Sequence, residues 1–125
     1  MATSVAEIYD NDEHFAYIIY CDGSGSGADL QASIDLSSTV AGSGSASEIC
    51  VELVQHSLKA TDKFVQIKFH TQLVLQLYGV GQMGGEGISR ITQLKTVDTT
   101  SSQDINFVFE SAGTVFIQLR KVSGF

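Results

Sequence analysis

Hydrophobic and polar residues alternate along most of this chain. In one clear example, Val65, Ile67 and Phe69 alternate with Gln66 and Lys68. Successive side chains of a β-strand point to opposite faces, so a period of two is typical of a strand with one buried face. The pattern predicts about eight strands, at residues 15–21, 29–37, 48–58, 64–70, 72–78, 88–95, 104–110 and 114–121.

Two of the predicted strands contain runs that are apolar on both faces, at residues 15–21 and 49–54. Such runs indicate central strands, or strands covered on both sides. Segment 88–94 is ambiguous because its apolar residues recur every three positions, but the threonines around it favour a strand. The phases of all these runs predict one core, formed by Ile19, Leu36, Val51, Leu53, Val65, Ile67, Phe69, Leu75, Phe107, Phe109, Ile117 and Leu119.

Glycine and serine separate the predicted strands. Segments 23–27, 42–45 and 79–87 are rich in glycine, which reaches positive φ angles at no steric cost, so they are expected to be turns and loops. Many short strands joined by such turns are typical of antiparallel sandwiches and barrels. We therefore expect an all-β fold, a jelly-roll-like antiparallel β-sandwich, in a single domain over residues 1–125.

The length of 125 residues is sufficient for a core that needs no metal or disulfide. The net charge is −7, and residues 1–62 carry ten acidic side chains and one basic side chain. An acidic protein repels phosphate backbones, so nucleic acid is not an expected partner. The uneven charge suggests a basic partner surface, although acidic residues also keep proteins soluble.

No apolar run approaches the ~20 residues of a membrane-spanning helix, so no membrane partner is expected. The first residues have neither the basic nor the apolar region of a secretory signal. The two cysteines, Cys21 and Cys50, lie in apolar runs and are expected to be buried free thiols, with a bridge between two strands as the alternative.

Candidate chemistry is sparse. Residues 79–84 spell G-x-G-x-x-G after a strand, but no strand–helix–strand pattern surrounds this motif, so a flexible loop is favoured over a dinucleotide site. Residues 22–29 contain two aspartates among glycines without the spacing of a calcium loop. His14, His56 and His70 lack the spacing of zinc ligands. We expect no catalytic residues, no cofactor and no metal.

Several short motifs follow one another in a recognisable order: residues 20–25 (YCDGSG), 33–38 (SIDLSS), the central strands 49–58 and 64–70 with their turn at 60–62, Gly84-Gly85, and the closing segment 115–121. This order resembles a family of small virion proteins of tailed bacteriophages, common among phages of marine bacteria. Two features differ from the family pattern: a tryptophan of the fourth strand is missing, and no glycine precedes Asp22.

This resemblance implies a non-enzymatic structural protein of the virion, a capsid decoration or cement protein on the head surface. Such a protein would be made in the host bacterial cytoplasm and would bridge subunits of the major capsid protein, with neighbouring copies of itself as further partners. The alternative is a β-sandwich binding module of a phage tail or fibre that recognises a saccharide or a host surface.

The contacts with neighbouring chains are expected in the glycine-rich loops and in an N-terminal arm at residues 1–12, because unpaired segments become ordered where a partner holds them. The expected interface residues are Met1, Ala2, Thr3, Ser4, Val5, Gly23, Gly25, Gly27, Gly42, Gly44, Gly81, Gly84 and Gly85. The opposite interpretation is that all these segments remain exposed to solvent.

Overall fold

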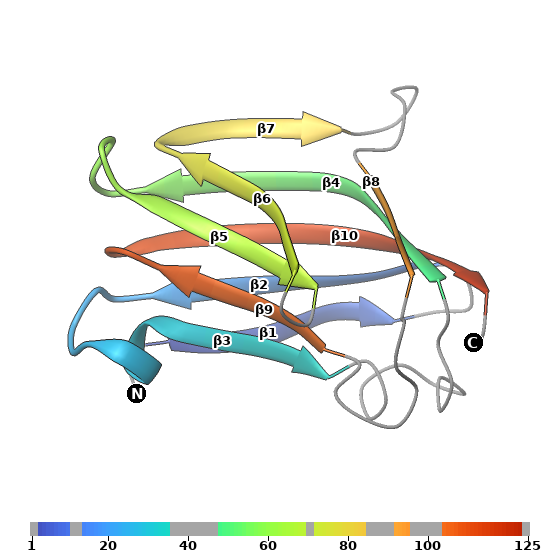
Figure 1. Cartoon of the computed structure of the whole chain (residues 1–125), viewed down its shortest axis with the longest axis horizontal. Helices are drawn as coiled ribbons and strands as arrows, with labels where there is room; N and C mark the ends of the chain where they lie inside the picture. Colours follow the sequence, from blue (N-terminus) through green and yellow to red (C-terminus); the bar gives the residue numbers. More distant parts are fainter. Residues whose placement is uncertain are drawn as a thin grey trace.

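Alternating side chains build two antiparallel sheets that pack face to face in a computed structural model of the chain (Figure 1). The structure describes residues 3–10, 14–35, 48–69, 72–84, 92–95 and 104–123. Its elements are β1 (Thr3–Asp10), β2 (His14–Cys21), the 3₁₀ turn η1 (Gly27–Leu30), β3 (Gln31–Asp35), β4 (Glu48–Leu58), β5 (Phe64–Phe69), β6 (Gln72–Tyr78), β7 (Val80–Gly84), β8 (Thr92–Lys95), β9 (Asp104–Phe109) and β10 (Gly113–Ser123).

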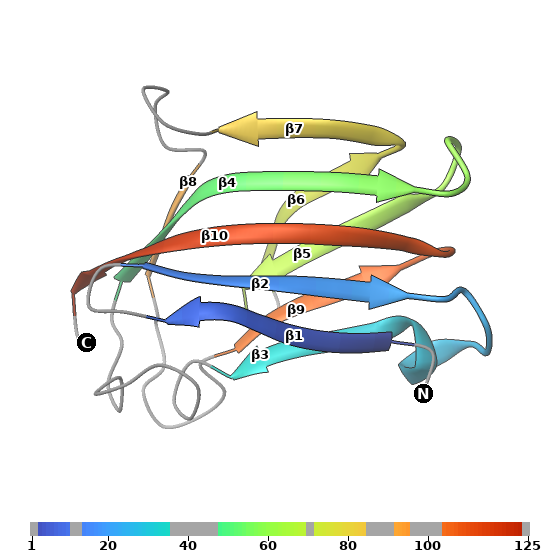
Figure 2. The same ribbon diagram turned by 180° about the vertical axis from the view of Figure 1, so that it is seen from behind.

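The strand order is that of a jelly roll. Sheet A has the order β1-β2-β10-β4-β7, with β8 also paired to β4, and sheet B has the order β3-β9-β5-β6. Consecutive strands lie in different sheets at six points: β2 and β3, β3 and β4, β4 and β5, β6 and β7, β8 and β9, and β9 and β10. Figure 2 shows the fold from the sheet A side. Two interleaved Greek keys of this kind define the jelly roll, so the predicted fold is confirmed.

The core lies between the sheets, where the inner residues of both interdigitate. Among the predicted core residues, Ile19, Val51, Val65, Ile67, Phe107, Phe109, Ile117 and Leu119 are at most 2% exposed. Leu75 is only partly buried, although it packs against this cluster. Leu36 and the side chain of Phe69 lie outside the described part of the chain.

The prediction for Leu53 is wrong, because a β-bulge changes the phase of β4. Gln118 of β10 pairs with Leu53, whereas the next residue, Leu119, pairs with Val51, so Glu52 is an extra residue in β4. A bulge of this kind lets residues three positions apart share a face. Val51 and Val54 are therefore both buried, and Leu53 belongs to the outer face of sheet A.

Two strands were not predicted. Residues 80–84, expected in a flexible loop, form β7, which pairs with β4. Thr3–Asp10, expected in a contact arm, forms the edge strand β1, paired with β2. Thr3 is 7% exposed, and its Oγ1 donates a hydrogen bond of 2.7 Å to the carbonyl of Gln31. This bond links sheet A to the start of β3 in sheet B.

The structure excludes a Cys21–Cys50 bridge. Cys21 is a buried free thiol next to Gly113 at the start of β10, whereas Cys50 pairs with Arg120 near the other end of that strand. At about 3.4 Å per residue these positions are roughly 20 Å apart along the sheet. A disulfide requires Cα atoms within about 7 Å of each other.

We predict that Cys21 contributes to a loss of stability at alkaline pH. Burial raises the pKa of the Cys21 thiol, with a smaller raising effect from Asp22, against a hydrogen bond from the Gly23 N–H that lowers it. In the unfolded chain the pKa of this thiol is ~8.5. The folded chain therefore keeps the thiol proton at pH values where the unfolded chain has lost it. Under that condition the free energy of unfolding falls as pH rises.

Urea unfolding at a series of pH values from neutral to alkaline would measure this effect. The variant Cys21→Ala should lose less stability over the alkaline range than the unsubstituted chain. Burial also raises the pKa of Tyr9, and this contribution remains in both proteins. Identical pH dependence in the two proteins would contradict the assignment to Cys21.

Candidate interaction surface

The outer face of sheet A is a continuous surface built from every second residue of five neighbouring strands. Paired residues of antiparallel strands project to the same side of a sheet, so the register arranges the side chains of this face in three rows. From β1 to β7 the rows are Ser4, Tyr20, Thr114, Ser57 and Val80; Ala6, Ile18, Phe116, Gln55 and Gln82; and Tyr9, Ala16, Gln118, Leu53 and Gly84. We call these residues the outer face of sheet A, in which Ala16 is covered by its neighbours and is 0% exposed.

The three rows contain no charged residue, and much of their surface is apolar. The charged side chains of Glu52 and Arg120 lie beyond the third row on the same face. Val80 is 78% exposed and Tyr20 is 50% exposed. Ile18, Phe116 and Leu53 are half-buried by their neighbours. A surface of contiguous apolar side chains is uncommon on the solvent side of an antiparallel sheet, which is normally polar.

The outer face of sheet B combines bonded polar side chains with two exposed apolar residues, Leu73 and Tyr78, which are 48% and 49% exposed. Ser33 Oγ donates to Asn106 Oδ1 over 2.5 Å, and Gln66 Nε2 donates to Gln76 Oε1 over 2.8 Å. Gln76 Nε2 in turn donates to the Tyr78 hydroxyl over 2.7 Å. These side chains bond to one another across the strands, so this face is suited to contact with water. The outer face of sheet B therefore differs from that of sheet A in its network of bonded polar side chains, while both faces expose apolar residues.

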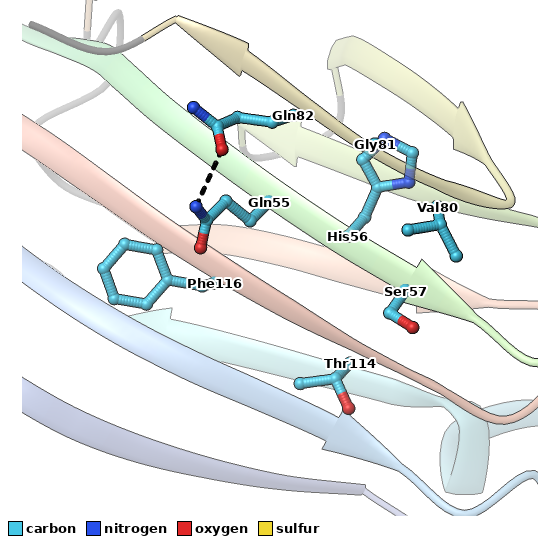
Figure 3. Close-up of a pocket in the computed structure, with 8 residues that line it drawn as sticks. All are labelled: Gln55, His56, Ser57, Val80, Gly81, Gln82, Thr114 and Phe116. Carbon is cyan, nitrogen blue, oxygen red and sulfur yellow. Dashed lines mark hydrogen bonds between the residues drawn. The ribbon is translucent and has the colours of Figure 1, made fainter.

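A hollow of about 460 Å³ lies on the outer face of sheet A, over β4, β7 and β10 (Figure 3). Gln55 Nε2 donates a hydrogen bond of 2.9 Å to Gln82 Oε1 at one side of it. The Phe116 ring lies beside this amide pair, and the hydroxyls of Ser57 and Thr114 lie toward the other end (Figure 3). The hollow thus offers neutral polar groups and an aromatic ring.

His56 also lines the hollow, but its ring is held inside the sandwich. The residue is 8% exposed, and Nδ1 lies 3.1 Å from the Gly79 carbonyl oxygen. A carbonyl oxygen can only accept, so Nδ1 carries the proton in this contact. A Cβ atom on Gly81 would be 2.9 Å from His56 Nε2, which explains why glycine suits the position beside this ring. His56 therefore has a structural role here.

A polar cluster lies at the bulge, next to the third row. Glu52 Oε1 lies 2.9 Å from His14 Nε2, and Glu52 Oε2 lies 3.9 Å from Arg120 Nε. Burial raises the pKa of the nearby Tyr9 hydroxyl, and the negative charge of Glu52 raises it further. The carboxylate of Glu52 and the guanidinium of Arg120 carry opposite charges, so this pair adds no net charge beside the third row.

The predicted interface residues fall into two groups at opposite edges of sheet A. Thr3 pairs with Cys21, so the start of β1 lies at the same end as the exposed loop that holds Gly23, Gly25 and Gly27. Gly81 and Gly84 lie on β7, at the other edge. Ser4 and Val5 are exposed on β1, and Met1, Ala2, Gly42, Gly44 and Gly85 lie outside the described residues.

The loop after β2 has internal bonds that account for part of its sequence. The backbone N–H and the hydroxyl of Ser24 both donate to Asp22 Oδ1, at 2.8 and 2.7 Å. These two bonds lower the pKa of the Asp22 carboxyl. Asp22 therefore stabilises a local turn of the kind that aspartate commonly forms with the residue two positions on.

Among the residues of the outer face of sheet A, sequence reasoning named only Ser4 and Gly84 as interface residues and missed the others. One signal was present, because the run at residues 15–21 is apolar on both faces and thereby places Ile18 on the side away from the core. Phe116, Gln55 and Val80 belong to three other strands. Their proximity to Ile18 depends on the strand order.

No protein-family model matches the chain, and a comparison with curated proteins found no match. Within the described ranges, no group of three or more His, Cys, Asp or Glu side chains is placed to hold a metal ion. The same residues contain no helix with the length and hydropathy needed to cross a bilayer. The outer face of sheet A is the feature of the described structure with the strongest implication for function.

Proposed function

We propose that this chain is a non-enzymatic structural protein of a tailed-phage virion, a decoration protein that stabilises the head by bridging capsid subunits. The observation that carries the proposal is the uncharged and partly apolar outer face of sheet A. Exposed apolar side chains such as Tyr20 and Val80, next to half-buried ones, are found where proteins assemble with others. The jelly roll adds support by analogy only, since the fold recurs in capsid proteins, lectins and cupins.

The proposal agrees with the sequence resemblance described above, which gives the virion as the location and the major capsid protein as the partner. A decoration protein gains its effect from many identical contacts, each of them small. The acidic loops of the first half of the chain, such as the exposed Asp22 and Asp29, would favour a basic surface on the shell.

Quantitative mass spectrometry of purified particles would test this function. We expect the chain at a fixed ratio to the major capsid protein, in copy numbers comparable with those of the shell subunits. Particles assembled without the chain should release their DNA at a lower temperature, and added purified chain should restore the original temperature. Absence from particles, or the few copies typical of a tail component, would overturn the proposal.

The hollow favours one second candidate, a binding module of a phage tail or fibre for a saccharide. Neutral sugars are bound by aromatic rings together with amide and hydroxyl groups, and the hollow offers the Phe116 ring with Gln55 and Gln82. Binding of the purified chain to an array of bacterial glycans, lost in Phe116→Ala, would support this function. Gln66→Ala, on the outer face of sheet B, is the matched control and should bind normally.

A further inference from the structure

We propose that a second copy of this chain packs on the outer face of sheet A, with the sheets of the two copies face to face around a two-fold axis along β10. This dimer deepens the proposed function. Its biological setting, a phage particle, rests on that function, whereas its geometry does not. It names the occupant of the outer face of sheet A and the arrangement of the pair.

Charge favours a copy of the same chain over a different partner. The chain has a net charge of −7, so two copies repel each other wherever their acidic surfaces meet. They can approach closely only through a surface without net charge. The three rows of the outer face of sheet A contain no acidic residue, and Glu52, which lies beside the third row, is paired with His14 and Arg120. A basic partner would instead be matched by acidic side chains on the face that it covers.

The available area is sufficient for a weak specific dimer. Five strands about 4.8 Å apart and three rows about 6.8 Å apart give a footprint of roughly 500 Å² per copy. A pair would then bury about 1,000 Å², near the lower limit of specific interfaces. We therefore expect association in the micromolar range, strengthened when many copies gather on one surface.

The position of β10 in the sheet determines which residues meet. β10 is the central strand of the order β1-β2-β10-β4-β7. A two-fold axis along it sets β2 of each copy over β4 of the other and brings the two Phe116 side chains together. Isologous contacts of this kind are self-complementary, because each contact occurs twice.

The hollow gives this arrangement a specific fit. Tyr20 belongs to the same row as Thr114, Ser57 and Val80, and Ser57, Val80 and Thr114 line the hollow. The axis along β10 therefore places Tyr20 of each copy, which is 50% exposed in the isolated chain, over the hollow of the other. Buried aromatic anchors in pockets supply much of the affinity of protein interfaces.

Sedimentation velocity of the purified full chain over a range of concentrations would test the proposal. We expect a monomer–dimer equilibrium, and Ile18→Glu should weaken the association at least about tenfold, because it places a charge in the buried centre. Val108→Glu is the matched control, since Val108 is also half-buried but lies on the outer face of sheet B. Thermal unfolding of each variant would show that it is folded.

A cross-linking experiment tests the axis without depending on a disruptive substitution. Facing sheets pack about 10 Å apart, which is too far for a disulfide, so a short bismaleimide is the suitable reagent. Phe116→Cys should give a covalent dimer at low concentration, whereas Val108→Cys and the unsubstituted chain should not. A monomer at all concentrations, a trimer, or equal cross-linking at both positions would overturn the proposal.

The two proposals fail in different experiments. If the chain is present in particles at shell-like copy number but is monomeric in solution and gives no Phe116→Cys cross-link, the proposed function is supported and the dimer is contradicted. If the chain forms the dimer but is absent from particles, the dimer is supported and the proposed function is contradicted.

Discussion

Replacement of Phe107 by alanine is expected to lower the free energy of unfolding by about 3–5 kcal/mol. Phe107 is 0% exposed, and it lies on β9 between Ala32 of β3 and Ile67 of β5. Loss of the ring leaves a cavity in the middle of sheet B that neighbouring strands cannot fill, because their own side chains are fixed by the opposite sheet. The loss is a large fraction of the ~5–15 kcal/mol typical of a whole domain.

Urea denaturation followed by circular dichroism would measure this loss, at a concentration where the chain is monomeric. Phe116→Ala is the matched control, since it removes the same ring from the half-buried outer face of sheet A. It should destabilise the monomer less, because the Phe116 ring is only partly buried in the single chain. Similar losses for both variants would mean that Phe116 belongs to the core of the single chain.

The contrast between these phenylalanines shows how far the sequence predicts the structure. Phe107 lies in a run that alternates regularly, and β9 has no bulge, so its burial follows from period two alone. Leu53 lies one residue after the bulge at Glu52, and nothing in the local sequence marks that extra residue. Its position on the outer face depends on the pairing of β4 with β10.

Strands β1 and β7 were missed for a related reason. Both lie at edges of sheet A, where a strand has one neighbour and need not alternate between apolar and polar residues. Val5 and Ile8 of β1 are both exposed, and β7 contains Gly81 and Gly84. Their strand conformation comes from hydrogen bonds to β2 and β4, which are tertiary contacts.

The glycines expected at the interface include at least one with a clear role inside the chain. Gly23 has a φ of +81°, in the left-handed region, and a Cβ atom there would be 2.8 Å from the backbone nitrogen of Ala112. Ala112 cannot easily move, because its carbonyl accepts a hydrogen bond of 2.9 Å from Lys59 N. The sequence predicted a glycine-rich turn here. It could not show that Ala112, in the turn between β9 and β10, lies against Gly23 and leaves no room for a side chain, because that contact depends on the fold.

Gly23→Ala is therefore expected to cost about 2–4 kcal/mol, from strain at a positive φ together with the contact with Ala112. Gly27→Ala is the control, since Gly27 has a φ of +59° but a Cβ atom there would meet nothing within 4 Å. That variant should lose only about 1 kcal/mol, from the backbone conformation alone. Thermal and urea unfolding of the two variants would measure the difference, and sedimentation would show that neither alters the monomer–dimer equilibrium. Equal stability of the two variants would contradict the role of Ala112. Weaker dimerisation of both variants would show that this loop belongs to the interface.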